Sequence, residues 1–278
     1  MLTDYHVHLR PDEPEAVASA YFTAANAERY REAAADRGIA ELGVAEHIHR
    51  FTQALEVWQH PWYRQWATDD LDAYAAFVRE ETDLRLGLEV DYLPGREDRL
   101  GGLLERYEWD YVVGSVHFVG DHAIDVDEVA FDVWRHAATA EQVWRRYFET
   151  LAEAARSGLF DILAHPDLVK VWGTGRPLPD RDPRFFYEPA VEAMAEAGVA
   201  VEVSTAGLRK PAAEIYPSRA LLEMVADAGC PVALSSDAHR PEDIGHEYDQ
   251  ALELLDSVGI RELCIFDRRS RTLEPIGG

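Results

Sequence analysis

Residues 1–8 guide the interpretation of the whole chain, and they read Met1-Leu2-Thr3-Asp4-Tyr5-His6-Val7-His8. The first part of this stretch suits a short β-strand, and it runs directly into a His-X-His pair. Because alternate side chains of an extended chain point the same way, His6 and His8 can direct two imidazoles at one point just beyond the strand. Two histidines at this spacing suit a metal ion, although the pair alone does not establish one.

Further short apolar runs along the chain end in His, Asp or Glu, as the first one does. The predicted strands are Leu2–Val7, Glu41–Ala45, Arg85–Val90, Tyr111–Val116, Asp161–Leu163, Val199–Val203 and Val232–Leu234. Most are rich in Val, Leu or Ile, which is typical of buried parallel strands. The predicted helices between them are Ala24–Asp36, Asp69–Glu81, Thr139–Arg156, Pro189–Glu196, Ala220–Ala228 and Pro241–Ser257, with Thr23, Thr68 and Ser218 as caps.

Strands that alternate with helices predict βα units and a parallel sheet. Seven such units in one domain favour a distorted, TIM-like (βα)7 barrel over an open doubly wound sheet. No glycine-rich dinucleotide motif follows the first strand, which weakens the open alternative further. The expected fold is therefore an α/β barrel formed as a single domain by residues 1–278. Its site is expected at the C-terminal ends of the strands, where such barrels place their active sites.

The charge and cysteine content exclude several classes of partner. The chain has 27 basic and 52 acidic residues, a net charge of −25. Nucleic acids and anionic membrane surfaces favour basic patches, so neither is expected as a partner. Cys230 and Cys264 lie far apart, and no stretch approaches the ~18–20 apolar residues of a membrane span. We therefore expect a cytoplasmic protein, with its oligomeric state left open.

Candidate metal ligands occupy the ends of the predicted strands. They are His6, His8, His47, Glu89, His117, His165, Asp237 and His239. Mixed imidazole and carboxylate ligands suit zinc, iron or manganese, and the lack of nearby cysteines argues against a closed structural zinc site. The ligands are too many for one ion, so two or three divalent ions sharing a carboxylate are expected. Clusters of ions ~3.5–4 Å apart are typical of phosphoester hydrolysis.

These residues and several longer motifs resemble the PHP (polymerase and histidinol phosphatase) superfamily, and within it the histidinol-phosphatase branch. The motifs are His6-Val-His8, Glu46-His47, Glu89, Gly114-Ser-Val-His-Phe-Val119, His165, Thr205-Ala-Gly-Leu-Arg-Lys-Pro211, Glu214-Ile-Tyr-Pro-Ser218 and Ser235-Ser-Asp-Ala-His-Arg-Pro-Glu-Asp243. The resemblance covers nearly the whole chain. It implies a distorted (βα)7 barrel with three metal ions that hydrolyses L-histidinol phosphate, a small phosphate monoester, in histidine biosynthesis.

The resemblance also implies a set of metal ligands. They are His6, His8, Glu89 and Asp237 for the first ion, Glu89, His117 and His165 for the second, and His47 and His239 for the third. Many relatives carry another histidine six residues after the second histidine of the His-X-His pair, where this chain has Pro14. Glu13 is the expected substitute ligand, with Asp12 and Glu15 as the nearest alternatives.

The expected mechanism assigns roles to four further positions. Metal ions would activate water for in-line attack on phosphorus. Asp237 and His239 are the expected catalytic residues, and either His239 or a metal-bound water would protonate the leaving alkoxide. Arg209 and Lys210 follow the sixth strand and are expected to bind phosphate, which the guanidinium fork matches. Glu46 is expected to orient a neighbour or to meet solvent rather than to bind metal.

Three alternatives remain open at this point. Trp58, Trp62, Tyr63 and Trp66 either pack a loop or form a wall for an imidazole ring. The enzyme could instead be a PHP phosphoesterase acting on nucleotides or nucleic-acid ends, which its acidity disfavours. A non-catalytic metal-binding or polymerase-associated module is a third possibility, and the complete ligand set argues against it.

Overall fold

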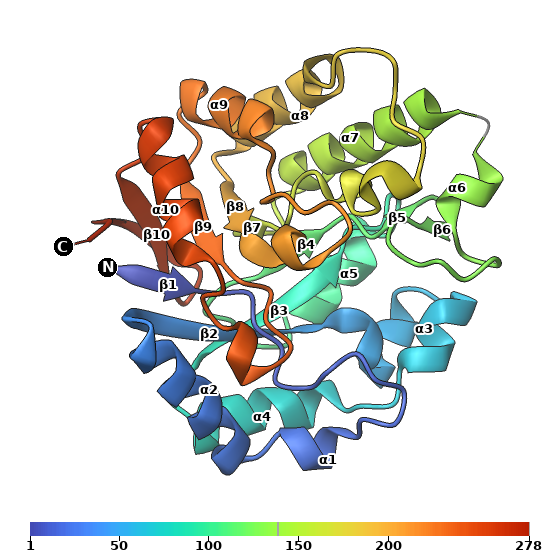
Figure 1. The fold of residues 1–278 in the computed structure, drawn as a ribbon. Helices are drawn as coiled ribbons and strands as arrows, with labels where there is room; N and C mark the ends of the chain where they lie inside the picture. The colour runs from blue at the N-terminus through green and yellow to red at the C-terminus, as the bar shows by residue number, and fades with distance from the viewer. Residues whose placement is uncertain (138, 278) are drawn as a thin grey trace.

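A ring of parallel strands surrounded by helices forms the fold (Figure 1), in a computed structural model that describes residues 1–137 and 139–277. Seven strands lie in the order β1-β2-β3-β4-β7-β8-β9, and all neighbours in this series are parallel. Their bounds are β1 (Leu2–Asp4), β2 (Ile39–His47), β3 (Arg85–Asp91), β4 (Val113–Ser115), β7 (Ile162–Leu163), β8 (Ala200–Ser204) and β9 (Val232–Ser235). The predicted α/β fold class is confirmed.

The two edges of this sheet approach each other and make a nearly closed barrel. Beyond β1 and β9, Val7 and Ala238 form a parallel bridge, and the His8 backbone N–H donates to the Ala238 carbonyl at 2.8 Å. The Asp4 carboxylate accepts a hydrogen bond from the Ser236 backbone N–H at 3.0 Å. The motifs near the two ends of the sequence therefore lie at the same point of the barrel.

Helices cover the outside of the barrel (Figure 1). They are α1 (Ala18–Tyr21), α2 (Ala24–Asp36), α3 (Pro61–Trp66), α4 (Leu71–Glu81), α5 (Glu97–Leu104), α6 (Val133–His136), α7 (Ala140–Arg156), α8 (Arg184–Ala197), α9 (Arg219–Asp227) and α10 (Tyr248–Ser257). Short 3-10 helices are η1 (Ile48–Arg50), η2 (Thr52–Glu56), η3 (Leu168–Lys170), η4 (Gly173–Gly175), η5 (Thr205–Arg209) and η6 (Pro241–Asp243). Within the described residues, every helix is too short or too polar to span a bilayer.

Two hairpins complete the fold, and three helix predictions need correction. The helix predicted over Pro189–Glu196 begins earlier, at Arg184, so Pro189 lies inside α8. The hairpins pair β5 (Phe118–Val119) with β6 (His122–Ala123) and β10 (Glu262–Asp267) with β11 (Ser270–Pro275). Asp70, not Thr68, caps α4, because its carboxylate accepts the Asp72 backbone N–H at 2.9 Å. The helix predicted over 241–257 is divided into η6 and α10, because Gly245 between them adopts a left-handed φ of 59°.

Aromatic side chains fill the barrel at the N-terminal ends of the strands. Tyr111 lies against the backbones of Gly43 and Gly87 so closely that a Cβ at either glycine would overlap its side chain. Tyr5 packs edge-on against Tyr111 and against Phe266 of β10, with ring centroids 5.0 Å and 5.4 Å apart. Because aromatic rings fill this end of the barrel interior, the interior leaves room for polar side chains toward the C-terminal ends of the strands.

Candidate metal centre

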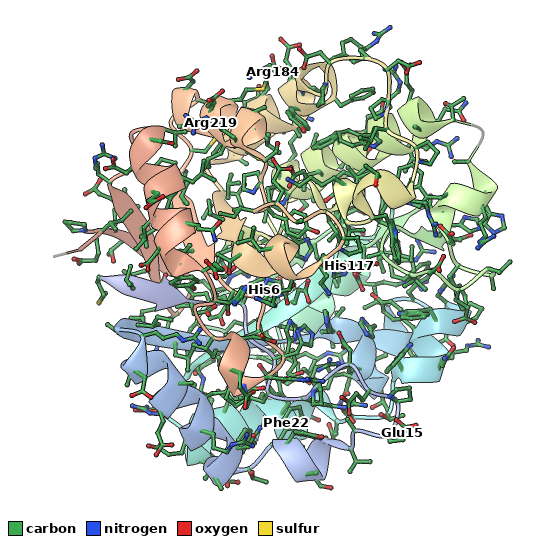
Figure 2. The ribbon with its side chains drawn as sticks, viewed as in Figure 1. His6, Glu15, Phe22, His117, Arg184 and Arg219 are labelled. Carbon is green, nitrogen blue, oxygen red and sulfur yellow. The ribbon has the colours of Figure 1, made fainter. Side chains whose placement is uncertain are left out.

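Histidine and carboxylate side chains gather at the C-terminal ends of the barrel strands. His6 and His117 lie near the middle of the molecule in Figure 2, although more than a hundred residues separate them in the chain. The full set is His6 and His8 after β1, His47 at the end of β2, Glu89 in β3, His117 after β4, His165 after β7, and Asp237 and His239 after β9. Eight of the nine predicted ligands therefore lie in one cluster, and Glu13 is the exception.

Four overlapping triads share this cluster, and in each the ligand atoms lie within 4.8 Å of one another. They are His8–His47–His239, His6–His165–Asp237, His6–His8–Glu89 and His47–Glu89–His117. Glu89 faces more than one of them. Its Oε2 lies 3.3 Å from His6 Nε2, and its Oε1 lies 3.4 Å from His117 Nε2 and 3.2 Å from His165 Nε2. This placement suits a carboxylate shared between two ions.

Several buried polar atoms of the cluster have no hydrogen-bond partner among the described residues. They are His6 Nε2, both ring nitrogens of His8, Glu89 Oε2, His165 Nδ1 and Asp237 Oδ1. Leaving a buried polar atom unpaired costs about 1–3 kcal/mol, so such a concentration is unfavourable unless another group satisfies it. Imidazole nitrogens and carboxylate oxygens are the ligands of zinc and of related divalent ions. The residues present therefore fit a metal centre.

Burial and neighbouring charges set the protonation of the cluster in the absence of metal. Burial alone would raise the pKa of Glu89, but the surrounding imidazoles, led by His47, hold it well below its ordinary value. Burial lowers the pKa of His8 well below its usual range, and His239 lowers it further. Burial also opposes protonation of His47 and His117, but Glu89 and other carboxylates outweigh it and raise their pKa values to about 9 and about 10.

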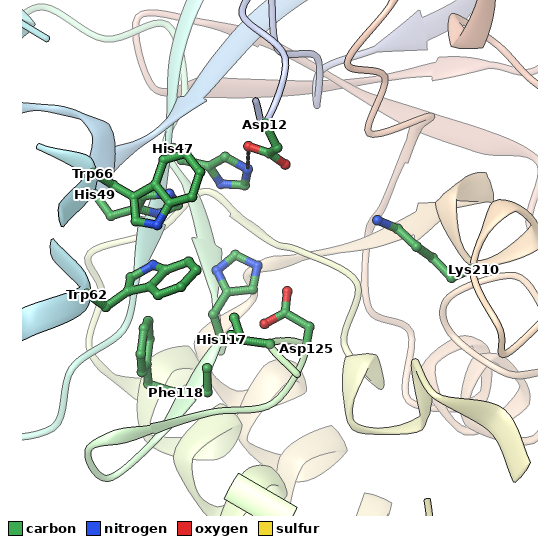
Figure 3. Close-up of a pocket in the computed structure, with 11 residues that line it drawn as sticks. Asp12, His47, His49, Trp62, Trp66, His117, Phe118, Asp125 and Lys210 are labelled. Carbon is green, nitrogen blue, oxygen red and sulfur yellow. Dashed lines mark ion pairs between the residues drawn. The ribbon is translucent and has the colours of Figure 1, made fainter. Parts of the chain in front are cut away.

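A cavity of about 340 Å³ opens beside the cluster. Asp12, His47 and His117 line it on the side of the cluster, and Lys210, Asp125, His49, Trp62, Trp66, Phe118, Ala123 and Val126 complete its lining (Figure 3). Trp62 and Trp66 therefore line a cavity, as a wall would, and the imidazole ring that the second interpretation placed against them stays a prediction. Trp58 and Tyr63 are buried in the hydrophobic core, as the loop-packing interpretation held.

The two predicted phosphate-binding cations differ in their surroundings. Arg209 Nη2 donates to the carbonyls of Ser236 and Asp237, at 2.8 Å and 3.0 Å, and so supports the turn that carries the Asp237 side chain. Arg209 Nη1 is buried without a hydrogen-bond partner in the described part of the chain. The Lys210 side chain extends into the cavity from the opposite side to Trp62 (Figure 3).

Comparison with known proteins identifies the family. Residues 17–206 match the family model described as PHP domain. The chain belongs to the PHP family. It is 34% identical over 254 residues to a probable histidinol-phosphatase of Deinococcus radiodurans, which covers 88% of this chain and 91% of that protein. It is 28% identical over 188 residues to a histidinol-phosphatase of Bacillus subtilis, which covers 63% of this chain and 70% of that protein.

Two solved structures share the PHP barrel. The histidinol phosphate phosphatase of Lactococcus lactis, in complex with zinc, L-histidinol and phosphate, has a TM-score of 0.70 and 19% identity over 98% of each chain. A putative histidinol phosphatase of Listeria monocytogenes has a TM-score of 0.71 and 20% identity, and the match covers 89% of this chain and 99% of that one. At these identities the likeness establishes the common fold.

Two carboxylates that the sequence left without a role hold candidate metal ligands in position. Glu202 in β8 lies with its Oε1 2.8 Å from His6 Nδ1, and its Oε2 accepts the His165 backbone N–H at 2.6 Å. Asp91 at the end of β3 lies with its Oδ1 2.7 Å from His117 Nδ1. Carboxylates behind metal-bound histidines fix the ring orientation. Glu202 could have been found in the sequence, because it is an acidic residue within an otherwise apolar predicted strand.

Glu46 matches its expected role of orienting a neighbour. Its Oε1 accepts hydrogen bonds from the backbone N–H groups of Leu9 and Arg10, at 2.7 Å and 3.2 Å. Its Oε2 contacts the guanidinium of Arg50, which is almost completely buried. Glu46 therefore fixes the loop that follows the His-X-His pair.

Asp12 and Glu13 are adjacent in that same loop, but their side chains make different contacts. Asp12 Oδ2 lies 2.9 Å from His239 Nε2, and Asp12 Oδ1 lies 3.7 Å from His47 Nε2 and also contacts Arg50. Glu13 turns toward Arg240, whose Nη2 lies 3.4 Å from its Oε1. The expected substitute ligand Glu13 is therefore not brought to the cluster, whereas its neighbour is.

Proposed function

We propose that this PHP protein is a metal-dependent hydrolase that converts L-histidinol phosphate and water into L-histidinol and phosphate, a step of histidine biosynthesis. Residues 1–278 would act as one catalytic domain. The observation that carries the proposal is the set of buried imidazole and carboxylate atoms beside an open cavity that have no hydrogen-bond partner in the described part of the chain. The substrate is supported by the histidinol-phosphatase names of the relatives and by the L-histidinol and phosphate in the Lactococcus lactis structure.

The proposed centre holds two to three divalent ions. Zinc is present in the Lactococcus lactis structure, and iron and manganese suit the same ligands. The ligands would be His6, His8, Glu89 and Asp237 for the first ion, Glu89, His117 and His165 for the second, and His47, His239 and Asp12 for the third. The choice of Asp12 over Glu13 rests on its distances to His239 and His47.

Bound divalent ions would lower the pKa of water and neutralise charge on the phosphoryl oxygens. The side chains supply the remaining steps. Lys210 and the free Nη1 of Arg209 offer positive charge to the phosphate. Asp237 would hold the first ion, which would lower the pKa of the attacking water. Either His239, which lies at the edge of the cluster, or a water held at the cluster would donate a proton to the leaving alkoxide.

The alternative is a PHP phosphoesterase that acts on nucleotides or nucleic-acid ends. The net charge of −25 disfavours a polyanionic substrate, because no counterion release would drive its binding. A cavity of about 340 Å³ with aromatic walls suits a small monoester better than a strand of nucleic acid.

Phosphate release from three substrates distinguishes the two functions. The zinc-loaded protein would be assayed with L-histidinol phosphate, a 3′,5′-nucleoside bisphosphate and a short RNA. We expect L-histidinol phosphate to have the highest kcat/KM by a wide margin. Turnover of the bisphosphate or the RNA without turnover of L-histidinol phosphate would reject the proposed function in favour of the alternative.

A further inference from the structure

The carboxylate of Asp91 has a second contact, on the side away from the ligand that it supports. Its Oδ1 lies 2.7 Å from His117 Nδ1, and its Oδ2 accepts a hydrogen bond from the Tyr63 hydroxyl at 2.6 Å. The Ser115 hydroxyl is farther from the same His117 nitrogen, at 3.2 Å. All three side chains of the series Tyr63–Asp91–His117 are buried. They therefore form one buried chain of hydrogen bonds, from a tyrosine through a carboxylate to an imidazole.

This chain of hydrogen bonds decides which nitrogen of His117 is available to an ion. Burial alone would raise the pKa of Asp91, but its contacts with His117 and Tyr63 outweigh burial and hold the pKa below its ordinary value. An ionised carboxylate can only accept hydrogen bonds. In the neutral ring that an ion binds, the proton therefore stays on Nδ1, and the free nitrogen is Nε2, which lies 3.4 Å from Glu89 Oε1.

The ring of Tyr63 is packed so that its hydroxyl meets Asp91 at a fixed place. Tyr63 lies in helix α3 and is completely buried. Its ring packs edge-on against Trp58 and against Phe118, with centroids 5.2 Å and 6.3 Å apart. Because side chains in a close-packed interior keep one orientation, the hydroxyl is a rigid support for the carboxylate.

The same three-part arrangement supports a second candidate ligand, His6. The Ser235 hydroxyl donates to Glu202 Oε1 at 2.6 Å, and that oxygen lies 2.8 Å from His6 Nδ1. His8 differs, because Glu46 Oε2 is 3.9 Å from its Nδ1, too far for a hydrogen bond. The two arrangements come from different strands and helices, so neither is a by-product of one local fold.

We propose that Tyr63 is a positioning residue for the ion that His117 holds. Its hydroxyl keeps the Asp91 carboxylate directed at His117 Nδ1, so loss of the hydroxyl weakens that ion without removing a ligand. Trp62 and Trp66 of the same helix line the cavity beside His117 (Figure 3), so α3 connects the cavity wall to the metal centre. The inference rests on the metal ligands of the proposed function and not on its substrate.

The test compares the zinc affinities of Tyr63→Phe and Tyr92→Phe. Tyr92 is the matched control, because it is also buried and donates to a carboxylate, Glu97 Oε1, at 2.7 Å, but Glu97 lies in α5 on the outside of the barrel. Titration of the metal-free protein with zinc against a chromophoric chelator gives the affinity of each ion. We expect one affinity to fall about tenfold in Tyr63→Phe. All affinities of Tyr92→Phe should stay within about twofold of those of the unaltered protein.

The same titration in an Asp91→Asn background separates positioning from general packing. We expect Asp91→Asn alone to lower that affinity by about 10–100-fold, and Tyr63→Phe to add less than about twofold to the loss, because the hydroxyl acts only through Asp91. Full additivity of the two changes, equal losses in Tyr63→Phe and Tyr92→Phe, or no loss in Tyr63→Phe would overturn the inference. A Tyr63→Phe protein that does not fold would also overturn it. The expected zinc affinities without phosphate release from L-histidinol phosphate would instead reject the proposed function alone.

Discussion

At the scale of single residues, Asp12 is the side chain that distinguishes this centre from one with a histidine in the same loop. Its carboxylate lies 2.9 Å from His239 Nε2, while Glu13 contacts Arg240. We predict that Asp12→Asn removes about one ion per chain at limiting zinc, because an amide is a weaker ligand than a carboxylate. Glu13→Gln is the matched control and should keep the full metal content.

Elemental analysis of both purified variants after dialysis measures this prediction. Loss of metal from Glu13→Gln with retention in Asp12→Asn would reverse the assignment of the two residues. Loss from neither would show that His47 and His239 hold the third ion without a carboxylate from this loop.

Metal uptake should release protons. The pKa values of His47 and His117 in the metal-free fold, about 9 and about 10, lie above the ordinary histidine value of 6.5. Both rings are therefore protonated near neutral pH. The stabilisation of the metal-free fold that follows is full below about pH 6.5 and is lost as the pH rises through about 9 and about 10. Ions bind only the neutral ring, so zinc must displace both protons.

Calorimetric zinc titration in two buffers of different ionisation enthalpy measures the released protons. We predict clear release at about pH 7.5 and progressively less as the pH rises above about 9. Equal heats in the two buffers at about pH 7.5 would contradict the assignment of these two histidines as ligands.

Eight candidate ligands were predictable from the sequence, whereas the ligand in the loop after His8 was not. His6, His8 and Asp237 follow apolar strands, and parallel strands present their C-terminal ends at one face, so pattern alone places them together. Asp12 and Glu13 are adjacent carboxylates in a loop, and only the path of that loop around Arg50 distinguishes them.

At the scale of elements, Gly87 lets strand β3 pack directly against Tyr111 in the barrel core. A Cβ at Gly87 would overlap the ring of Tyr111, whereas a Cβ at Gly102 in α5 would meet open space. We predict that Gly87→Ala lowers the free energy of unfolding by about 1–3 kcal/mol through overpacking. Gly102→Ala should leave it unchanged or raise it by up to about 1 kcal/mol, because Ala favours a helix.

Chemical denaturation of the two variants measures this difference. The Gly87→Ala change also lies two residues before Glu89 on the same strand, so we expect it to weaken metal binding as well as stability. Equal stability of the two variants would show that Tyr111 moves aside without cost, and that the close approach does not require glycine.

Long helices could be predicted from the spacing of apolar residues in the sequence, whereas very short strands could not. Helix α2 lies where apolar spacing and the Thr23 cap predicted it, since both signals agree. The hairpin β5–β6 was not predicted, because two-residue strands carry no readable alternation. That hairpin supports the loop bearing Asp125, so the cavity wall was less predictable than the metal cluster.

At the scale of the whole molecule, barrel closure explains why one site draws on residues from His6 to His239. The β1 and β9 edges meet through His8 and Ala238, which brings the last motif beside the first. The aromatic filling around Tyr111 closes the opposite end. The overall fold was predictable because seven strand–helix units leave few other arrangements, whereas the filling by Phe266 depends on the unpredicted β10–β11 hairpin.

The central claim is that this barrel holds a metal-dependent phosphatase for L-histidinol phosphate. Its most direct test is phosphate release from that substrate as zinc is added back to metal-free protein, with Asp237→Asn beside the exposed control Asp227→Asn. We predict no release without metal, restoration by zinc, and about 100-fold lower kcat/KM in Asp237→Asn only. Full activity without metal, or wild-type activity in Asp237→Asn, would contradict the account.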